Sequence, residues 1–534
     1  MNSAWKRLTK IHNKRKQAPQ YKETEIKSNI QKVSEHLDEN LKNIKDALGN
    51  SSDLEIREFK MGKPSLHKVA IIYINGLADK NIISNFVIER LMGNVHNTES
   101  VNPQSPSQLF TYIKENIVAV GTVEGITDWD KMLLSLLSGK TILLLDGWNQ
   151  VISCAAEGGE LRSITEPTIE PAVRGPKESF VESLITNTAM IRHRIKSPNL
   201  WIETMKLGNI TQTDVAIMYV KGIVDDKLLT EVKERIGKIE VEEVGGSNTI
   251  EEWITDDTLT PWPTMFVTER PDVVAGQLLE GRVTIFVDGT PNPIILPATW
   301  ISFFQTAEDY YLRWSMASFL RFLRIVAFIM TLFGPSLFIS FTAFHSELIP
   351  TALLISLAAQ RQGIPFPIFF EALLMELTFE VLREAGVRMP RPIGQAVSIV
   401  GALVLGEAAV AAGIVSSAMV IVVAGTAIAS FTIPHHPMMD AVRLLRFLMM
   451  VLAASFGLYG VGLGLIVLVA HTCSVRSFGI PYLAPFAPLI FADWKDAFMR
   501  MPKPFLSTRP RLINQTNITR TGNSKNRGPK PREN

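Results

Sequence analysis

Cysteine is nearly absent from this sequence: its 534 residues include two, Cys154 and Cys473. Two thiols cannot form a disulfide framework or a four-cysteine zinc site, and such sparse use of cysteine is typical of a reducing compartment. The first residues also lack the apolar segment of a secretion signal. We therefore expect that the soluble part of the chain is not exported.

Motifs for catalysis are also missing, since the sequence contains no G-x-S-x-G, H-E-x-x-H or C-x-x-C. The segment 138–141 (SGKT) resembles a phosphate loop, but Leu134 stands where the first glycine is needed, and Lys140 precedes an apolar strand pattern rather than a helix. His435 and His436 lie between two prolines, which favours a polar turn at a membrane edge over a metal site. We predict a protein that is not an enzyme and has no cofactor or bound metal.

The chain as a whole has no large excess of positive or negative charge, since its formal net charge is +2. This balance argues against nucleic acid as a partner. The positive charge is concentrated at the ends: residues 1–17 carry six Lys or Arg and no acid, and residues 494–534 carry ten against Asp496 and Glu533. By the positive-inside rule, both ends should lie in the cytoplasm, which requires an even number of membrane spans.

Long runs without charge are present in the second half of the chain. Ile325–Phe344 has twenty uncharged residues, enough to cross a hydrocarbon core of about 30 Å. Ile393–Ile433 contains one charge and is twice that length, so it predicts two spans with a turn near Ala412-Gly413. Phe447–Ala470 predicts a fourth span.

The segment between the first and second spans is ambiguous. Thr351–Gln360 is too short to cross, and Pro365 and Pro367 then open a helix that runs to about Ala385. Helical spacing puts its last four charged residues within one sector of about 100°. This amphipathic helix lies in the membrane interface, re-enters, or makes an additional crossing. The four residues are Glu376, Glu380, Arg383 and Glu384.

Acidic residues within these apolar segments are the candidate functional residues. An acid in a span is costly and usually faces a bundle interior or an aqueous path. If the protein is a symmetric ring, the acids repeat around its axis and favour cations. The alternative for Glu376 and Glu380 is the solvated face of an interfacial helix. The alternative for Glu407 is a position near a helix end, where the acid reaches the interface or pairs with an arginine. The ion-pathway candidates are Glu371, Glu376, Glu380 and Glu407, and Gly460 and Gly464 form a GxxxG motif that predicts helix packing.

The first half of the chain contains a repeat. KVAIIYINGLAD from Lys68 corresponds to DVAIMYVKGIVD from Asp214, and LLSGKTILLLDG from Leu136 corresponds to LLEGRVTIFVDG from Leu278. The spacing is nearly the same for both pairs. Each first block predicts a strand, a glycine turn and a helix, and each second block predicts a helix end, a strand and an Asp-Gly reversal. The sequence therefore predicts two related α/β lobes.

We predict an α/β soluble region of two related lobes followed by an α-helical transmembrane bundle. Its segments are a basic, helical N-terminal part (1–60), the first lobe (61–173), a helical inter-lobe segment (174–213), the second lobe (214–318), the transmembrane region (319–475) and a basic tail (476–534).

Several long segments resemble the A subunit of GerA-type spore germination receptors. They are LLSGKTILLLDG, RGPKESFVESLITNTAMIRHRI from Arg174, ERPDVV from Glu269, FVDGTPNPIILPA from Phe286 and EDYYLRW from Glu308. The resemblance implies a place in the spore inner membrane. It also implies a complex with a transporter-like B subunit and a lipoprotein C subunit, and an oligomeric, nutrient-gated cation channel. The alternative is a membrane-anchored module that binds a small ligand between the two lobes.

Overall fold

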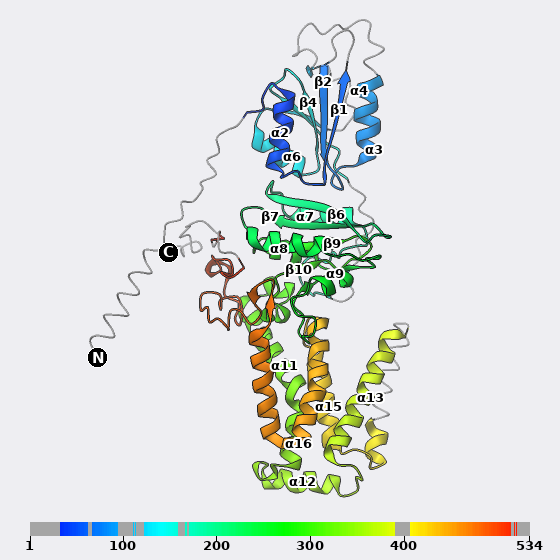
Figure 1. Cartoon of the computed structure of the whole chain (residues 1–534), viewed down its shortest axis with the longest axis vertical. Helices are drawn as coiled ribbons and strands as arrows, with labels where there is room; N and C mark the ends of the chain where they lie inside the picture. Colours follow the sequence, from blue (N-terminus) through cyan, green and yellow to red (C-terminus); the bar gives the residue numbers. More distant parts are fainter. Residues whose placement is uncertain are drawn as a thin grey trace, which may run out of the picture. The chain divides into compact units, whose positions relative to one another are not determined.

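The computed structural model describes residues 32–61, 67–93, 110–111, 113, 122–158, 166–167, 170–389, 406–513, 517 and 519–520. They form two compact units. The first contains residues 56–74 and 78–157 and the described part of 1–44, and the second contains residues 45–55, 75–77 and the described part of 158–534. Figure 1 labels most of the helices and several strands of both units.

The first unit contains most of a five-stranded sheet with the strand order β1-β2-β4-β5-β3. In its strands, apolar residues either alternate with polar ones or are buried throughout. Helices connect several of these strands along the chain. In chain order the elements are α2 (Leu37–Ala47), β1 (Leu54–Met61), β2 (His67–Ile74), α3 (Lys80–Ile82), η1 (Ile83–Ile88), α4 (Glu89–Gly93), β3 (Val123–Ile126), α6 (Trp129–Leu137), β4 (Thr141–Leu145) and β5 (Val151–Cys154).

A second sheet in the second unit has the equivalent order, β6-β7-β9-β10-β8. This match supports the predicted internal repeat. Its elements are α7 (Leu184–Arg194), β6 (Leu200–Leu207), β7 (Thr213–Val220), α8 (Asp226–Gly237), α9 (Ser247–Ile254), β8 (Phe266–Val267), α10 (Pro271–Leu278), β9 (Val283–Val287) and β10 (Ile294–Leu296). We call the β1–β5 fold the first lobe and the β6–β10 fold the second lobe.

The aspartate of the Asp-Gly pair accepts an equivalent hydrogen bond in both lobes. Asp146 accepts a hydrogen bond from the N–H of Leu37 at 3.1 Å, and Asp288 accepts one from the N–H of Leu184 at 3.0 Å. Each aspartate thus holds the start of the first helix of its lobe, where unsatisfied N–H groups favour an acid. The strands on either side of each pair are antiparallel neighbours, as the reversal signal predicted.

Two of the predicted segments need correction. Residues 174–213 are not mainly helical, because β6 (Leu200–Leu207) follows α7 and pairs with β7 along its whole length. Its buried residues alternate along much of the strand, a pattern that fits a half-buried strand better than a helix. Likewise β1 belongs to the first sheet although it lies within 1–60 for most of its length. The predicted basic stretch 1–17 lies outside the described residues.

The helical part of the second unit begins with the short turns η4 (Trp300–Phe304) and η5 (Ala307–Tyr310), which lead into a long helix. The further elements are α11 (Trp314–Ala343), η6 (Ser346–Leu348), α12 (Thr351–Arg361), α13 (Ile368–Arg388), α15 (Ser417–Ser430), α16 (His436–Ser474), β11 (Arg476–Ser477), β12 (Ile480–Pro481) and η7 (Lys503–Phe505). As expected, a turn lies at Ala412-Gly413, where Gly413 has a φ of 67°.

Helix α16 is a hairpin rather than one straight helix. Gly457 has a non-helical backbone (φ 57°, ψ −142°), and both ends of α16 contact the second lobe. At the first end His435 bonds the carbonyl of Gln305 at 3.0 Å, and near the other His471 bonds Thr260 at 2.9 Å. The prediction of a single span over Phe447–Ala470 is therefore wrong, because the chain reverses within it.

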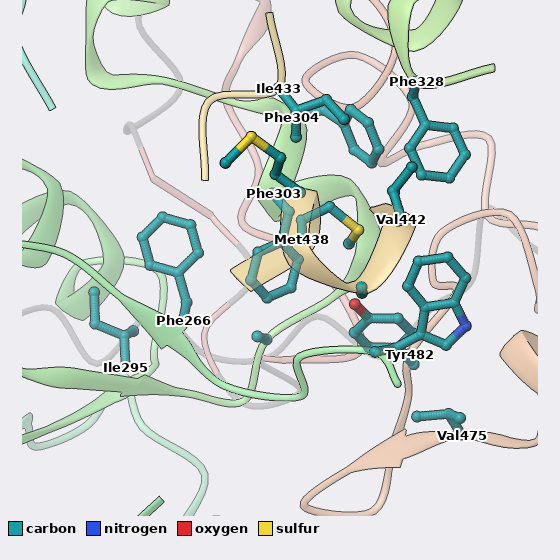
Figure 2. Close-up of a cluster of buried hydrophobic side chains, with 14 of the residues drawn as sticks. Phe266, Ile295, Phe303, Phe304, Phe328, Ile433, Met438, Val442, Val475 and Tyr482 are labelled. Atoms are coloured by element: carbon teal, nitrogen blue, oxygen red, sulfur yellow. The ribbon is translucent and has the colours of Figure 1, made fainter. Parts of the chain in front are cut away.

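Apolar side chains of the helices pack against those of the second lobe. Phe266 of β8 and Ile295 of β10 belong to the same buried cluster as Phe303, Phe328 of α11 and Met438 of α16. Figure 2 shows these side chains together with Val475 and Tyr482, which follow α16. Burial of several aromatic side chains is worth about 1.5–3 kcal/mol each, so this contact makes the lobe and the helices one unit.

Candidate functional site

Three of the acidic side chains of helix α13 point toward the neighbouring helices. Glu371 and Glu376 are 1% and 0% exposed, and Glu380 is partly buried. They face α15 and α16, so the interpretation of Glu376 and Glu380 as the solvated face of an interfacial helix is wrong. Glu384, one turn further, remains exposed and pairs with Arg388 on the same helix.

Glu376 and Glu380 meet two arginines of α16. Arg446 lies 2.7 Å from Glu376 and 3.2 Å from Glu380, and Arg443 lies 2.9 Å from Glu380. Thr426 of α15 donates a hydrogen bond to Glu376 at 3.4 Å. Burying these charges is tolerable because each acid has a cationic partner. We call Glu376, Glu380, Arg443 and Arg446 the acid–arginine cluster.

The cluster is electrically balanced as it stands. Its two carboxylates face two guanidinium groups, and the adjacent Asp440 accepts from Arg443 at 2.8 Å. Arg383 of α13 lies 3.8 Å from the same aspartate. Balanced pairs leave no excess negative potential for a cation, so the acids can serve a cation only if the arginines move away.

Glu371 is separate from this cluster. One carboxylate oxygen accepts hydrogen bonds from the backbone N–H of Ser416, at 2.6 Å, and from the Ser416 hydroxyl. The other lies 3.7 Å from Nε of Arg361, at the end of α12. Glu371 therefore joins the start of α13 to the start of α15 and the end of α12.

The remaining candidates have different surroundings. Glu407 lies in a helical stretch, 406–411, just before the Gly413 turn, and its side chain is exposed; the structure does not bring it to the other acids. Gly460 and Gly464 are buried against the other half of their own hairpin. A Cβ atom at Gly460 would meet the Leu452 carbonyl, and one at Gly464 would meet Met449. Their close packing is thus within α16.

The arginines and His435 are the residues that sequence reasoning missed. Arg443 and Arg446 precede the uncharged run Phe447–Ala470, and basic residues commonly flank a membrane span. Their spacing of three residues, which puts them on one helix face, was the available signal. His435 is 7% exposed, packs against Phe266 and lies 3.4 Å from Glu170, so it is not an interfacial polar turn.

A second charge network lies where the second lobe meets α11. Asp309 of η5 is fully buried and accepts from Arg324 at 2.8 Å and from Arg321 at 3.0 Å. Arg321 also bonds Asp496 at 3.0 Å, which ties the C-terminal segment to the same point. Burial alone would raise the pKa of Asp309, but the two arginines outweigh it and hold this pKa below its ordinary value.

We predict that Asp309→Asn destabilises the full chain by about 3–5 kcal/mol, because it leaves two buried arginines without their carboxylate. Since the folded pKa of Asp309 is lowered, its contribution is present above the unfolded pKa of about 3.9 and is lost as pH falls through the folded value. Thermal unfolding in detergent at pH 7 and at pH 3 measures both effects. Glu308→Gln at the next, partly exposed residue is the control, and an equal loss there would contradict the prediction.

A cavity of about 900 Å³ lies within the second unit, between the second lobe and the helices. Its lining includes Arg270 and Gly276 from the lobe, Tyr311 from the end of η5, and His435 and Met439 from the start of α16. The volume is that of a small-molecule site. Among the described residues, no group of three or more metal-ligating side chains is present.

Comparison with known proteins gives one consistent result. The family model described as Bacillus/Clostridium GerA spore germination protein matches residues 42–512. Spore germination protein KA of Bacillus subtilis (strain 168) is 46% identical over 93% of this chain and 90% of its own length. The uncharacterized membrane protein YfkQ of the same organism is 40% identical over 94% and 96%. The crystal structure of the N-terminal domain of the A subunit of the Bacillus megaterium spore germinant receptor GerK3 covers 51% of this chain and 98% of that domain, with 41% identity and a TM-score of 0.41.

Proposed function

Because this chain belongs to the GerA spore germination protein family, we propose that it is the A subunit of a nutrient germinant receptor whose helices cross the spore inner membrane. The observation that carries this proposal is the match over residues 42–512, which includes both the second lobe and the helices. As the resemblance implies, its partners are a transporter-like B subunit and a lipoprotein C subunit. We further propose that copies of the chain form a cation channel.

The helices support a membrane location. Helices α11 and α16 are long and apolar enough to cross a membrane, and α15 is a shorter apolar helix. At about 1.5 Å per residue, α11 is about 45 Å long, and the two halves of α16, 436–456 and 458–474, are about 31 and 26 Å. Large apolar side chains stay exposed on them, as lipid contact would allow: Ile421, Ile428, Leu444, Tyr459 and Val467.

Helix α13 fits the additional crossing that the sequence left open. It has 21 residues, about 31 Å, and runs from the Ser416 end of the bundle toward Arg443, near the lobe. Its buried acids have partners on neighbouring helices, as polar groups within a membrane require. In this arrangement the second lobe and the residues after α16 lie on one side, which agrees with the cytoplasmic ends expected from charge.

The acid–arginine cluster is where we place the gate of the channel. It joins α13 to α16, and its carboxylates are neutralised by arginines of the same chain. We propose that nutrient binding to the receptor separates these pairs and frees Glu376 and Glu380 to carry cations. A small shift of one helix past the other is enough to exchange one set of pairs for another.

Removing the chain tests the function directly. Spores without it should lose nutrient-triggered potassium release by at least tenfold for the nutrients it serves, and reintroduction of the intact gene should restore the release. Potassium set free by mechanical disruption of the same spores measures the stored ion. Unchanged release in the deleted spores, across a panel of amino acids, sugars and nucleosides, would overturn the proposal.

A further inference from the structure

The chain that follows α16 leaves several large apolar side chains uncovered. Within residues 486–511, which we call the surface segment, Phe491 is 69% exposed and Met499 is 60% exposed. Leu489, Met501 and Phe505 are exposed as well. Single exposed apolar residues are normal on a protein surface, but this many in one short segment indicate a surface that contacts something apolar.

The charged side chains of the surface segment differ in exposure according to their sign. Lys495, Lys503 and Arg511 are exposed. The two acids, Asp493 and Asp496, are partly buried and already accept hydrogen bonds, Asp493 from the N–H of Arg511 at 3.0 Å and Asp496 from an arginine of α11 at 3.0 Å. The exposed side chains are therefore apolar or cationic, a combination that is found in segments that lie on anionic membranes.

Hydrogen bonds hold the surface segment against the first turns of α11. The Arg500 guanidinium donates to the carbonyl of Leu312 at 2.8 Å, and the Ser318 hydroxyl donates to the carbonyl of Arg500 at 3.2 Å. Arg321 donates to both the carbonyl and the carboxylate of Asp496. These turns of α11 also expose large apolar side chains, namely Trp314, Met316 and Phe319. Two neighbouring stretches of the chain thus present apolar side chains outward.

The level of this contact relative to a membrane follows from the proposed function, on which the present inference rests. When α11 crosses a membrane, its uncharged run Ile325–Phe344 occupies the hydrocarbon core. Ser318 and Arg321 lie roughly 10 and 6 Å before this run along the helix axis. The headgroup region is about 5–8 Å thick on each side of the core. The surface segment therefore contacts α11 at the level of the headgroups or just outside them.

We propose that the surface segment lies on the membrane and binds anionic phospholipid headgroups. Its exposed apolar side chains, Phe491 above all, enter the boundary between headgroups and acyl chains, and Lys495, Lys503 and Arg511 meet the phosphates. Cations at this level attract an anionic leaflet, and long basic side chains can bury their stems while their charged ends stay in water. The positive charge disfavours pairing with the same segment of a second copy, which would bring like charges together.

The first test measures the depth of single labels on the full chain, reconstituted in nanodiscs of phosphatidylcholine and phosphatidylglycerol. Cys473→Ser removes the exposed native cysteine, and Cys154 is buried. A bimane label on Phe491→Cys is expected to be quenched by lipids that carry a nitroxide on the headgroup. The matched control is Thr204→Cys on β6, at the opposite edge of its sheet from β8, where quenching should be at least threefold weaker.

A label on the exposed Ile421→Cys of α15, used with a nitroxide in the acyl chain, reports the crossing of the membrane separately. Quenching at Ile421→Cys, with no more quenching at Phe491→Cys than at Thr204→Cys, would overturn the present inference and leave the proposed membrane location intact. Absence of quenching at both Ile421→Cys and Phe491→Cys would overturn both.

The second test measures the contribution of charge by thermal unfolding in nanodiscs with and without phosphatidylglycerol. We expect this anionic lipid to raise the unfolding temperature of the intact chain, because it binds the folded state. Lys495→Gln/Lys503→Gln should lose at least half of the rise. Lys206→Gln/Lys227→Gln, which removes two exposed lysines of the second lobe, should keep it. An equal rise in the two double variants would contradict the binding of anionic headgroups by the surface segment.

Discussion

Replacing Gly457 by valine is expected to reduce the amount of folded chain in the membrane at least tenfold. The φ and ψ of Gly457, 57° and −142°, lie close to a region that only glycine occupies readily. A Cβ atom there would also lie 2.9 Å from both Phe344 and His345, at the end of α11. Backbone strain of about 1–3 kcal/mol and this overlap add at the same residue.

The expected loss is large because the reversal at Gly457 determines where the rest of the chain goes. Without it, α16 would continue straight for about 58 Å, and His471 could not reach Thr260 of the second lobe. The contacts of Tyr482 and Val475 in the cluster of Figure 2 would be lost as well. The variant therefore affects the lobe as well as the helix.

Gly462→Ala is the control on the same hairpin, because a Cβ atom at Gly462 meets nothing within 4 Å. Immunoblots of membranes, together with size-exclusion profiles of the extracted chain, measure both variants. If Gly457→Val accumulates and elutes like the unchanged chain, the hairpin is not required for folding. If Gly462→Ala is lost equally, then added bulk anywhere in this glycine-rich stretch, rather than the reversal, is what the chain rejects.

The sequence predicted the lobes better than the helices, for a physical reason. Strand, glycine turn and Asp-Gly patterns are local, and the repeat showed each of them twice, so their arrangement could be read from the chain. Hydropathy, in contrast, shows that a run of residues is apolar, but it does not show whether the chain continues as one helix or reverses within the run. The uncharged run 447–470 therefore looked like one span, although the chain reverses inside it at Gly457.

The partners of the acids were hidden for a related reason. Glu376 and Arg446 are separated by 70 positions, and nothing local links them; they meet because α13 and α16 are neighbours. Strand β6 was missed because its neighbour α7 continues a helical pattern up to Arg194, and the pairing that makes Leu200–Leu207 a strand lies on β7. Tertiary contacts decide such segments, as they often override local preference.

Removal of one member of the Glu376–Arg446 pair is expected to cost about 3–5 kcal/mol, and removal of both is expected to cost less than either. Arg446→Met leaves Glu376 buried without its closest cation, and Glu376→Gln leaves Arg446 with Glu380 alone. The double variant Glu376→Gln/Arg446→Met keeps the neighbouring charges in balance. A double-mutant cycle on thermal unfolding in detergent measures the coupling between the two residues.

The same double variant separates a structural pair from an ion pathway. We expect the double variant to fold, but it lacks the Glu376 carboxylate that the open channel would present to cations. Potassium efflux from vesicles that contain the reconstituted receptor should therefore fall at least tenfold. Glu384→Gln/Arg388→Met removes an exposed pair from the same helix and should leave efflux unchanged. Efflux at the level of the unchanged receptor, in a double variant shown to be folded and assembled, would remove Glu376 from the pathway and leave it a structural role in joining α13 to α16.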